Sequence, residues 1–259
     1  MIRFDCHAHV YETLTAASGA RYVPAGTAPL SDWLAHGARH GIEGGVLVQV
    51  SFLGFDNAEL CAALSKLDRR RFAGVAVVPF DVSEAELDRL AALGVRGMRW
   101  NLVRGAALPD FGATIVDRHL EHLRRRGLHV EIQLESPRLP LVVAPLLDRG
   151  LTVVVDHFGL PDKHEPTPPS WLRTRAAATA VDRLYVKFSG AYRSLVEIAP
   201  HAKALLDVLP ADHVVWGSDW PHTQHEDRID YDRTVAERGT WPEFSDTLAA
   251  RSLYGIEPA

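Results

Sequence analysis

The first residues of the chain place an aspartate and two histidines at alternate positions, in Asp5-Cys6-His7-Ala8-His9. Because successive side chains of an extended strand point to opposite faces, we expect Asp5, His7 and His9 to share one face. Two imidazoles two residues apart can bind one metal ion or one substrate oxygen. The alternative is a polar strand end whose histidines are merely solvated.

A second candidate group ends the apolar run Val153-Val154-Val155, which is followed by Asp156 and His157. Histidine transfers protons near neutral pH and can polarise a carbonyl group, so His157 is a candidate catalytic residue. In the alternative interpretation, Asp156 caps a helix and the histidine is incidental.

Asp219 follows a third apolar run, Val214-Val215-Trp216, in the segment that continues Gly217-Ser218-Asp219-Trp220-Pro221-His222. A carboxylate at such a strand end can take a proton from water, and burial or a neighbouring anion would raise its pKa toward a useful range. A helix-capping role is the alternative. The candidate catalytic residues are therefore His7, His9, His157 and Asp219.

Arginines end two more segments, at Arg99 and Arg193, and Arg104 lies just beyond the first of them. Arginine binds carboxylates through paired hydrogen bonds, so these three side chains could hold an acidic substrate. For each arginine, a structural salt bridge is the alternative.

The residues that must position these groups alternate between short apolar runs and helical patterns. Continuous β-branched runs are typical of strands buried on both faces. The expected strands are Ile2–His9, Gly45–Val50, Phe72–Val78, Val95–Trp100, His129–Leu134, Leu151–Val155, Leu184–Phe188 and His213–Trp216. The expected helices are Ser31–His40, Asn57–Leu67, Glu84–Leu93, Thr114–Arg126, Pro140–Arg149, Trp171–Val181, Leu195–Leu209 and an interrupted region Tyr231–Leu253.

Eight strand–helix repeats favour a closed (β/α)₈ TIM-like barrel over an open doubly wound sheet, its alternative. The 259 residues suit one such domain, spanning residues 1–259, with its site at the carboxyl ends of the strands. With 47% hydrophobic and 24% charged residues the chain can form a large core.

Composition also limits the partners and the compartment. A net charge of −5 argues against nucleic acid as a partner. The two cysteines, Cys6 and Cys61, form no CxxC pair, and neither a signal peptide nor an apolar run of membrane-spanning length is present. We therefore expect a cytoplasmic protein without a membrane partner. Phosphate-binding glycine motifs and the GxSxG serine motif are absent from the sequence.

Six segments in order, DCHAHV, SFLGFDN, GVRGMRWN, DHFGLPD, KFSGAYR and WGSDWPH, together resemble the amidohydrolase-related family that contains 2-pyrone-4,6-dicarboxylate lactonase and sugar-acid lactonases. The resemblance covers nearly the whole chain. It implies a TIM-like barrel and hydrolysis of a lactone ester of a small organic acid. It also implies catalytic roles for the four residues named above, and substrate binding by Ser51, Arg99, Arg193, Arg104 and His222.

The fifth strand bears on the question of a metal. Metal-binding members of the wider superfamily commonly place a histidine or a modified lysine at its end, whereas here Gln133 and Glu135 lie near that end and His129 lies at the start. A neutral glutamine is a poor zinc ligand, so Gln133 is a further candidate substrate-binding residue. We therefore expect no cofactor, with a single zinc ion as the alternative.

These observations predict a lactonase whose partner is a small acidic lactone. Hydrogen bonds to a developing oxyanion, worth about 2.7–4 kcal/mol each, make catalysis of a reactive ester without metal credible. The alternatives are a metal-dependent decarboxylase on the same barrel and a binding protein without catalytic activity.

Overall fold

The computed structural model describes residues 2–178 and 180–259, and eight parallel strands form its centre. They follow one another in chain order around the sheet. The first and last strands are also joined, because His9 donates its backbone N–H to Trp220 O and Asp219 donates to His7 O, each at 2.8 Å. The sheet is therefore a barrel, and the open-sheet alternative is wrong. The strands are β1 (Phe4–Ala8), β2 (Gly44–Val48), β3 (Phe72–Ala76), β4 (Val95–Asn101), β5 (His129–Gln133), β6 (Val153–Val155), β7 (Leu184–Ser189) and β8 (Val214–Gly217).

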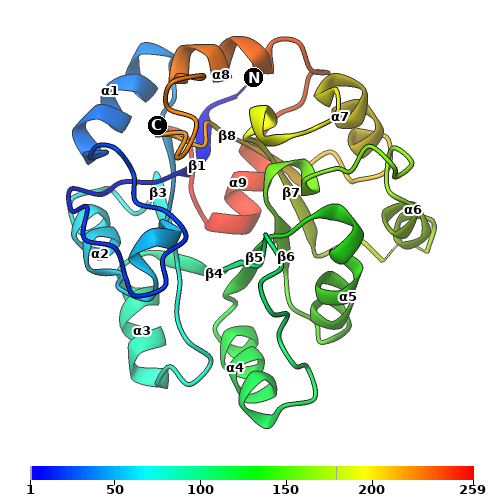
Figure 1. Ribbon diagram of the computed structural model, residues 1–259, viewed down its shortest axis with the longest axis horizontal. Coiled ribbons are helices and arrows are strands. Elements are labelled where there is room, and N and C mark those ends of the chain that lie inside the picture. Colours follow the sequence, from blue (N-terminus) through cyan, green and yellow to red (C-terminus); the bar gives the residue numbers. More distant parts are fainter. Residues whose placement is uncertain (1, 179) are drawn as a thin grey trace.

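Helices surround this ring of strands, and α9 lies across its middle in the view of Figure 1. Helix α9 contacts both β1 and β8. The helices are α1 (Leu30–Arg39), α2 (Ala58–Leu64), α3 (Glu84–Ala92), α4 (Thr114–Arg125), α5 (Pro140–Asp148), α6 (Ser170–Ala177), α7 (Ile198–Leu206), α8 (Tyr231–Arg238) and α9 (Thr247–Tyr254). Four short 3₁₀ helices follow strand ends: η1 (Ser51–Leu53), η2 (Ser136–Arg138), η3 (His157–Gly159) and η4 (Ala191–Arg193).

All eight predicted strands are present, and each observed bound lies within two residues of the predicted one. The predicted helices are also present, although the one expected over Trp171–Val181 includes residue 179, which lies outside the described residues. Helix α1 begins after Pro29 and has no side-chain cap. Ser83 does cap α3, since its Oγ accepts a hydrogen bond from the Glu86 N–H.

One expectation about β1 is wrong. The pairing of β1 with β2 shifts register between Asp5 and Ala8, and this interrupts the alternation of side chains. Asp5 therefore does not share a face with His7. Its carboxylate accepts hydrogen bonds from Trp33 Nε1 of α1, at 2.7 Å, and from Tyr231 OH of α8, at 3.1 Å, between the barrel and its helices.

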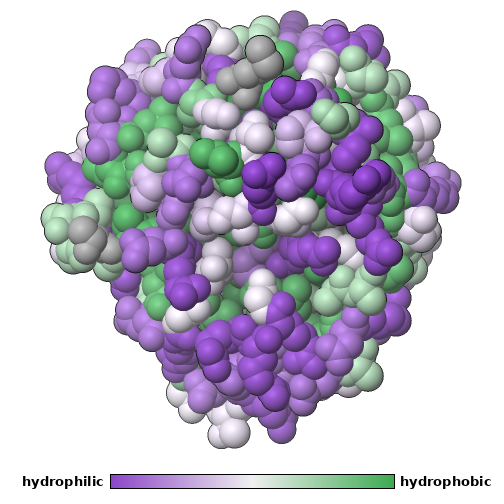
Figure 2. All heavy atoms as spheres, turned by 180° about the vertical axis from the view of Figure 1, so that it is seen from behind, coloured by the Kyte–Doolittle hydropathy of each residue, from purple (hydrophilic) through white to green (hydrophobic). Residues whose placement is uncertain are grey.

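Two observations describe the outside of the molecule. Hydrophilic side chains cover much of the face shown in Figure 2, with hydrophobic ones exposed between them. Among the helices of the described chain, none has the length and apolar character needed to cross a bilayer.

Candidate active site

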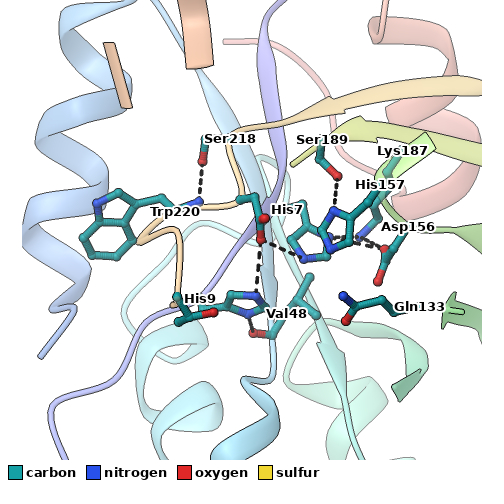
Figure 3. Close-up of polar contacts among 12 residues, drawn as sticks. His7, His9, Val48, Gln133, Asp156, His157, Lys187, Ser189, Ser218 and Trp220 are labelled. Carbon is teal, nitrogen blue, oxygen red and sulfur yellow. Dashed lines mark hydrogen bonds and ion pairs between the residues drawn. The ribbon is translucent and has the colours of Figure 1, made fainter. Parts of the chain in front are cut away.

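The four predicted catalytic side chains meet at the carboxyl ends of β1, β6 and β8. His7 Nε2 and His9 Nε2 lie 3.7 Å and 3.8 Å from the same atom, Asp219 Oδ1. The ring of His157 lies 4.8 Å from that of His7, measured between centroids. Figure 3 shows the three imidazoles turned toward one another, and all four side chains are buried.

An unusual backbone presents these groups. His157 and Asp219 adopt left-handed φ values of 54° and 61°, which non-glycine residues avoid because Cβ crowds the following carbonyl. Strained conformations of this kind concentrate at functional sites. Gly190, with φ of 56°, lies so close that a Cβ there would be 2.8 Å from both Asp219 Oδ2 and His157 Nδ1. The site therefore requires glycine at this position.

Burial keeps the three histidines neutral. It lowers the pKa of His7 well below its usual value, and the pKa values of His9 and His157 to about 4. His9 Nδ1 lies 2.7 Å from Val48 O, a carbonyl that can only accept, so Nδ1 carries the proton. The Nε2 lone pair of His9 consequently faces Asp219.

The pKa of Asp219 is shifted in the direction opposite to the one expected from the sequence. Burial alone would raise its pKa, but the Arg193 guanidinium and the neighbouring histidines outweigh burial and hold the pKa well below the usual range. Arg193 Nε donates to Asp219 Oδ2 at 2.6 Å, and Tyr192 OH donates to the same oxygen at 2.7 Å. The expectation of a raised pKa is therefore wrong, because a cation rather than an anion lies beside this carboxylate. Asp219 Oδ1 has no hydrogen-bond partner among the described residues.

A second buried group lies behind His7 and was not predicted. Lys187 Nζ, on β7, is 2.6 Å from Glu131 Oε2, 3.3 Å from His7 Nδ1 and 3.7 Å from Asp156 Oδ1. Asp156 also accepts from Arg99 Nε at 2.9 Å, so it is not a helix cap. Lys187 stands within the apolar run that forms β7, where side chains alternate between the barrel interior and its outside. A lysine at such a position was the signal for this buried group, and the sequence interpretation missed it.

A cavity of about 240 Å³ opens above these groups. Its wall includes five of the six predicted substrate-binding residues: Ser51, Arg99, Arg104, Gln133 and Arg193. His222 is buried and lies outside the lining. The sequence analysis did not select nine of the lining residues, among them Arg21, Tyr22, Asn101 and His225. Arg21 lies in the loop after β1, where no strand end marked it as a candidate.

Two of these arginines, Arg99 and Arg193, already donate hydrogen bonds to other residues of the chain. Arg99 Nη2 donates to Gln133 Oε1 at 2.6 Å, and Arg193 Nη2 lies 3.3 Å from Thr223 O. These bonds fix both guanidinium groups at the cavity wall. Each arginine can therefore form a structural salt bridge and still contact a substrate, so the two interpretations from the sequence do not exclude each other.

Comparison with known proteins decides the family, since the model of the amidohydrolase family matches residues 4–255. The chain belongs to this family. Over 254 residues it is 30% identical to a 2-pyrone-4,6-dicarboxylate hydrolase of Comamonas testosteroni, covering 90% of this chain and 81% of the relative. A 4-sulfomuconolactone hydrolase of Hydrogenophaga intermedia is 25% identical over 233 residues, 86% of this chain and 76% of the relative. Both relatives are lactone hydrolases, which confirms the predicted hydrolase class.

A solved structure from Pseudomonas putida, to which 2-pyrone-4,6-dicarboxylic acid hydrolase activity is ascribed, superposes with a TM-score of 0.85. It is 35% identical, and the match covers 99% of this chain and 98% of that chain. The TIM-barrel prediction is therefore confirmed by a relative as well as by the strand order.

The expectation of a site without a metal is wrong. Two overlapping sets of buried side chains could hold an ion, His7 with His157 and Asp219, and His7 with Glu131 and Asp156; within each set the ligand atoms lie within 4.8 Å of one another. Members of this fold do bind metal, since an amidohydrolase of Burkholderia multivorans with a TM-score of 0.71 and 17% identity contains zinc. The prediction failed because it required a histidine or a modified lysine at the end of the fifth strand, whereas the first set draws on β1 and the ends of β6 and β8 and the second uses a carboxylate, Glu131, from within β5.

The first set fits a cation better. His7 Nε2 and Asp219 Oδ1 are both buried and lack hydrogen-bond partners among the described residues, which is a costly arrangement without a ligand. Neutral imidazole nitrogens with one carboxylate are also typical zinc donors. The second set already surrounds the Lys187 ammonium, which supplies the positive charge there.

Proposed function

We propose that this chain hydrolyses the lactone ester of a small carboxylate-bearing organic acid. The observation that carries the proposal is the pairing of a buried group of three histidines and an aspartate with an arginine-lined cavity directly above it. Support comes from both lactone-hydrolysing relatives, whose named substrates carry acidic groups. The cytoplasmic location and the absence of a nucleic-acid partner stay predictions from composition.

Arg99, Arg104 and Arg193 would bind the substrate carboxylate, because guanidinium donors match its geometry. All three lie at or just beyond the carboxyl ends of β4 and β7, so the lactone carbonyl of a substrate held there would face the histidines. In this arrangement Ser189 Oγ, 2.9 Å from His157 Nδ1, would fix the His157 ring, which leaves Nε2 for the cation described below.

Asp219 would accept the proton of the attacking water through Oδ1, since Arg193 and Tyr192 occupy Oδ2. A lowered pKa keeps this carboxylate ionised at neutral pH, although it also makes it a weaker base than the sequence analysis assumed. A divalent cation held by His7, His157 and Asp219 would supply Lewis-acid polarisation of the ester carbonyl.

The substitution Asp219→Asn tests the proposal, because it keeps the shape and removes the basicity. We expect kcat for 2-pyrone-4,6-dicarboxylate to fall by about 10²–10⁴-fold with the melting temperature measured in parallel. A folded variant that retains most of the parental kcat would exclude Asp219 as the base. Failure of the parental enzyme to open any acidic lactone would refute the proposed function, and release of CO₂ would favour the decarboxylase.

A further inference from the structure

A second, larger cavity adjoins the one above the histidines. It has a volume of about 660 Å³, and four residues line both cavities: Arg21, Ser51, Arg99 and Asn101. The two spaces are therefore neighbouring compartments that share a wall. We call the larger one the annex.

The rest of the annex wall is mostly apolar. It comes from segments that follow β2, β3 and β4, and from the start of α4, including Phe55, Val78, Phe80, Leu102, Leu108 and Ile115. The carboxyl ends of these strands are the same end of the barrel that carries the catalytic group. The annex thus faces the site and is not a packing defect elsewhere in the core.

This apolar surface is open to water. The side chain of Phe55 is 62% exposed and that of Ile115 is 39% exposed. Phe80 is held as a firm wall, with its ring edge-on to Trp100 at 5.5 Å and to His119 at 5.4 Å. A rigid apolar wall beside a catalytic cavity is typical of a ligand subsite.

We propose that the annex binds an apolar substituent, alkyl or aromatic, on the acidic lactone that this enzyme hydrolyses. The inference rests on the proposed function for the identity of the molecule, and it adds the part of the substrate that the relatives' names do not contain. The 240 Å³ cavity has room for little more than a small ring with its acidic groups, whereas the annex has room for a second ring or a short chain.

Arg99 sets the direction of the substrate. Its guanidinium is fixed by Asp156 and Gln133, and it lies in the walls of both compartments. A carboxylate bound to this arginine places the remainder of its molecule beside the shared boundary. An apolar group there leaves water by entering the annex, whereas a charged group placed among the apolar side chains beyond Arg21 would lose its hydration without gaining a partner.

Binding measurements test the annex without requiring turnover. The probes are benzoate and biphenyl-4-carboxylate, which share the carboxylate and differ by one phenyl ring. We expect the biphenyl acid to bind the parental enzyme on the order of tenfold more tightly by calorimetry, as a well-seated apolar group should. Equal affinities of the two acids would overturn the proposal.

Two alanine substitutions provide the matched pair. Ala107→Trp introduces an indole at the exposed Ala107 in the annex wall, and Ala211→Trp introduces the same indole at the exposed Ala211, on the loop before β8. We expect Ala107→Trp to abolish the preference for the biphenyl acid while benzoate affinity is retained, and Ala211→Trp to change neither. A preference that survives Ala107→Trp at an unchanged melting temperature would refute the assignment.

Kinetics separates this inference from the proposed function. The substrates are 2-pyrone-4,6-dicarboxylate and a 2-pyrone carboxylate bearing a phenyl group in place of one carboxylate. We expect Ala107→Trp to raise KM about tenfold for the phenyl lactone alone. Turnover of both lactones with equal sensitivity to Ala107→Trp would refute the annex and leave the lactonase intact. If the parental enzyme hydrolyses neither lactone but still binds biphenyl-4-carboxylate more tightly than benzoate, the lactonase proposal is refuted and the apolar subsite stands.

Discussion

Gly190→Ala offers a sharp test of the site because the residue does two separable things. Its φ of 56° is left-handed, and its missing side chain leaves room for the groups around it. A Cβ at this position would lie 2.8 Å from Asp219 Oδ2, 2.8 Å from His157 Nδ1 and 3.2 Å from Arg193 Cδ. Ordinary contacts are about 3.5 Å or more, so these groups must move by roughly half an ångström or more.

The magnitude of each effect can be worked out. A left-handed alanine costs about 1–2 kcal/mol, which lowers the melting temperature of a chain this long by roughly 2–8 °C. A misplacement near 1 Å costs on the order of 10²-fold in rate, so we expect kcat to fall by roughly 10–100-fold. Both effects are measured on the same preparation, by thermal unfolding and by turnover of an acidic lactone.

Gly127→Ala is the matched control. Gly127 follows α4 with φ of 64°, and a Cβ there would meet no described atom within 4 Å. This variant carries the same backbone penalty without touching the site, so it should lose stability and keep its kcat. If Gly190→Ala also keeps its kcat, the inference that Gly190 holds Asp219 and His157 in a working position is wrong.

Three further outcomes are expected. Lys187→Met should lower the free energy of unfolding by about 3–5 kcal/mol in a denaturant titration, because Glu131 loses its buried cation. The control Lys203→Met, which breaks the exposed pair with Asp207, should lower it by less than about 1 kcal/mol. Burial raises the pKa of Asp246 from 3.8 to about 6, so the folded state binds the proton more tightly than the unfolded state. The free energy of unfolding should therefore fall by roughly 3 kcal/mol as pH rises from about 4 to about 6. Asp246→Asn removes the titrating group and should flatten that slope. Zinc added to chelator-treated protein should bind at one ion per chain by elemental analysis, and His157→Ala should weaken that binding at least tenfold; binding that His157→Ala leaves unaltered would remove this histidine from the ligand set.

The sequence was sufficient for the barrel because its signals are local and repeated. Continuous apolar runs such as Val153–Val155 mark strands, and a capping serine such as Ser83 marks the start of a helix. Since the carboxyl ends of parallel strands meet, placing polar residues at those ends was enough to bring His7, His157 and Asp219 together.

The electrostatics could not be obtained in the same way, because they depend on partners distant in the chain. The pKa of Asp219 is set by Arg193, 26 positions earlier, through a contact that no local pattern reports. Asp5 was assigned to the wrong face because a one-residue register shift cannot be read from alternation alone. Arg21 was missed because it lies in a loop, and only the path of that loop in the folded chain brings it to the cavity wall.

The charges around the histidines explain why an acidic substrate suits this site. Three buried carboxylates beside the histidines each have their own cation: Glu131 pairs with Lys187, Asp156 with Arg99 and Asp219 with Arg193. The floor of the cavity is therefore balanced before any ligand binds, while Arg21 and Arg104, opposed by Glu135 alone among the described residues of the wall, leave an excess of positive charge there. A divalent cation among His7, His157 and Asp219 would increase that excess. An anionic lactone compensates it, so substrate and cation stabilise each other in this cavity, and each should tighten the binding of the other by the same factor.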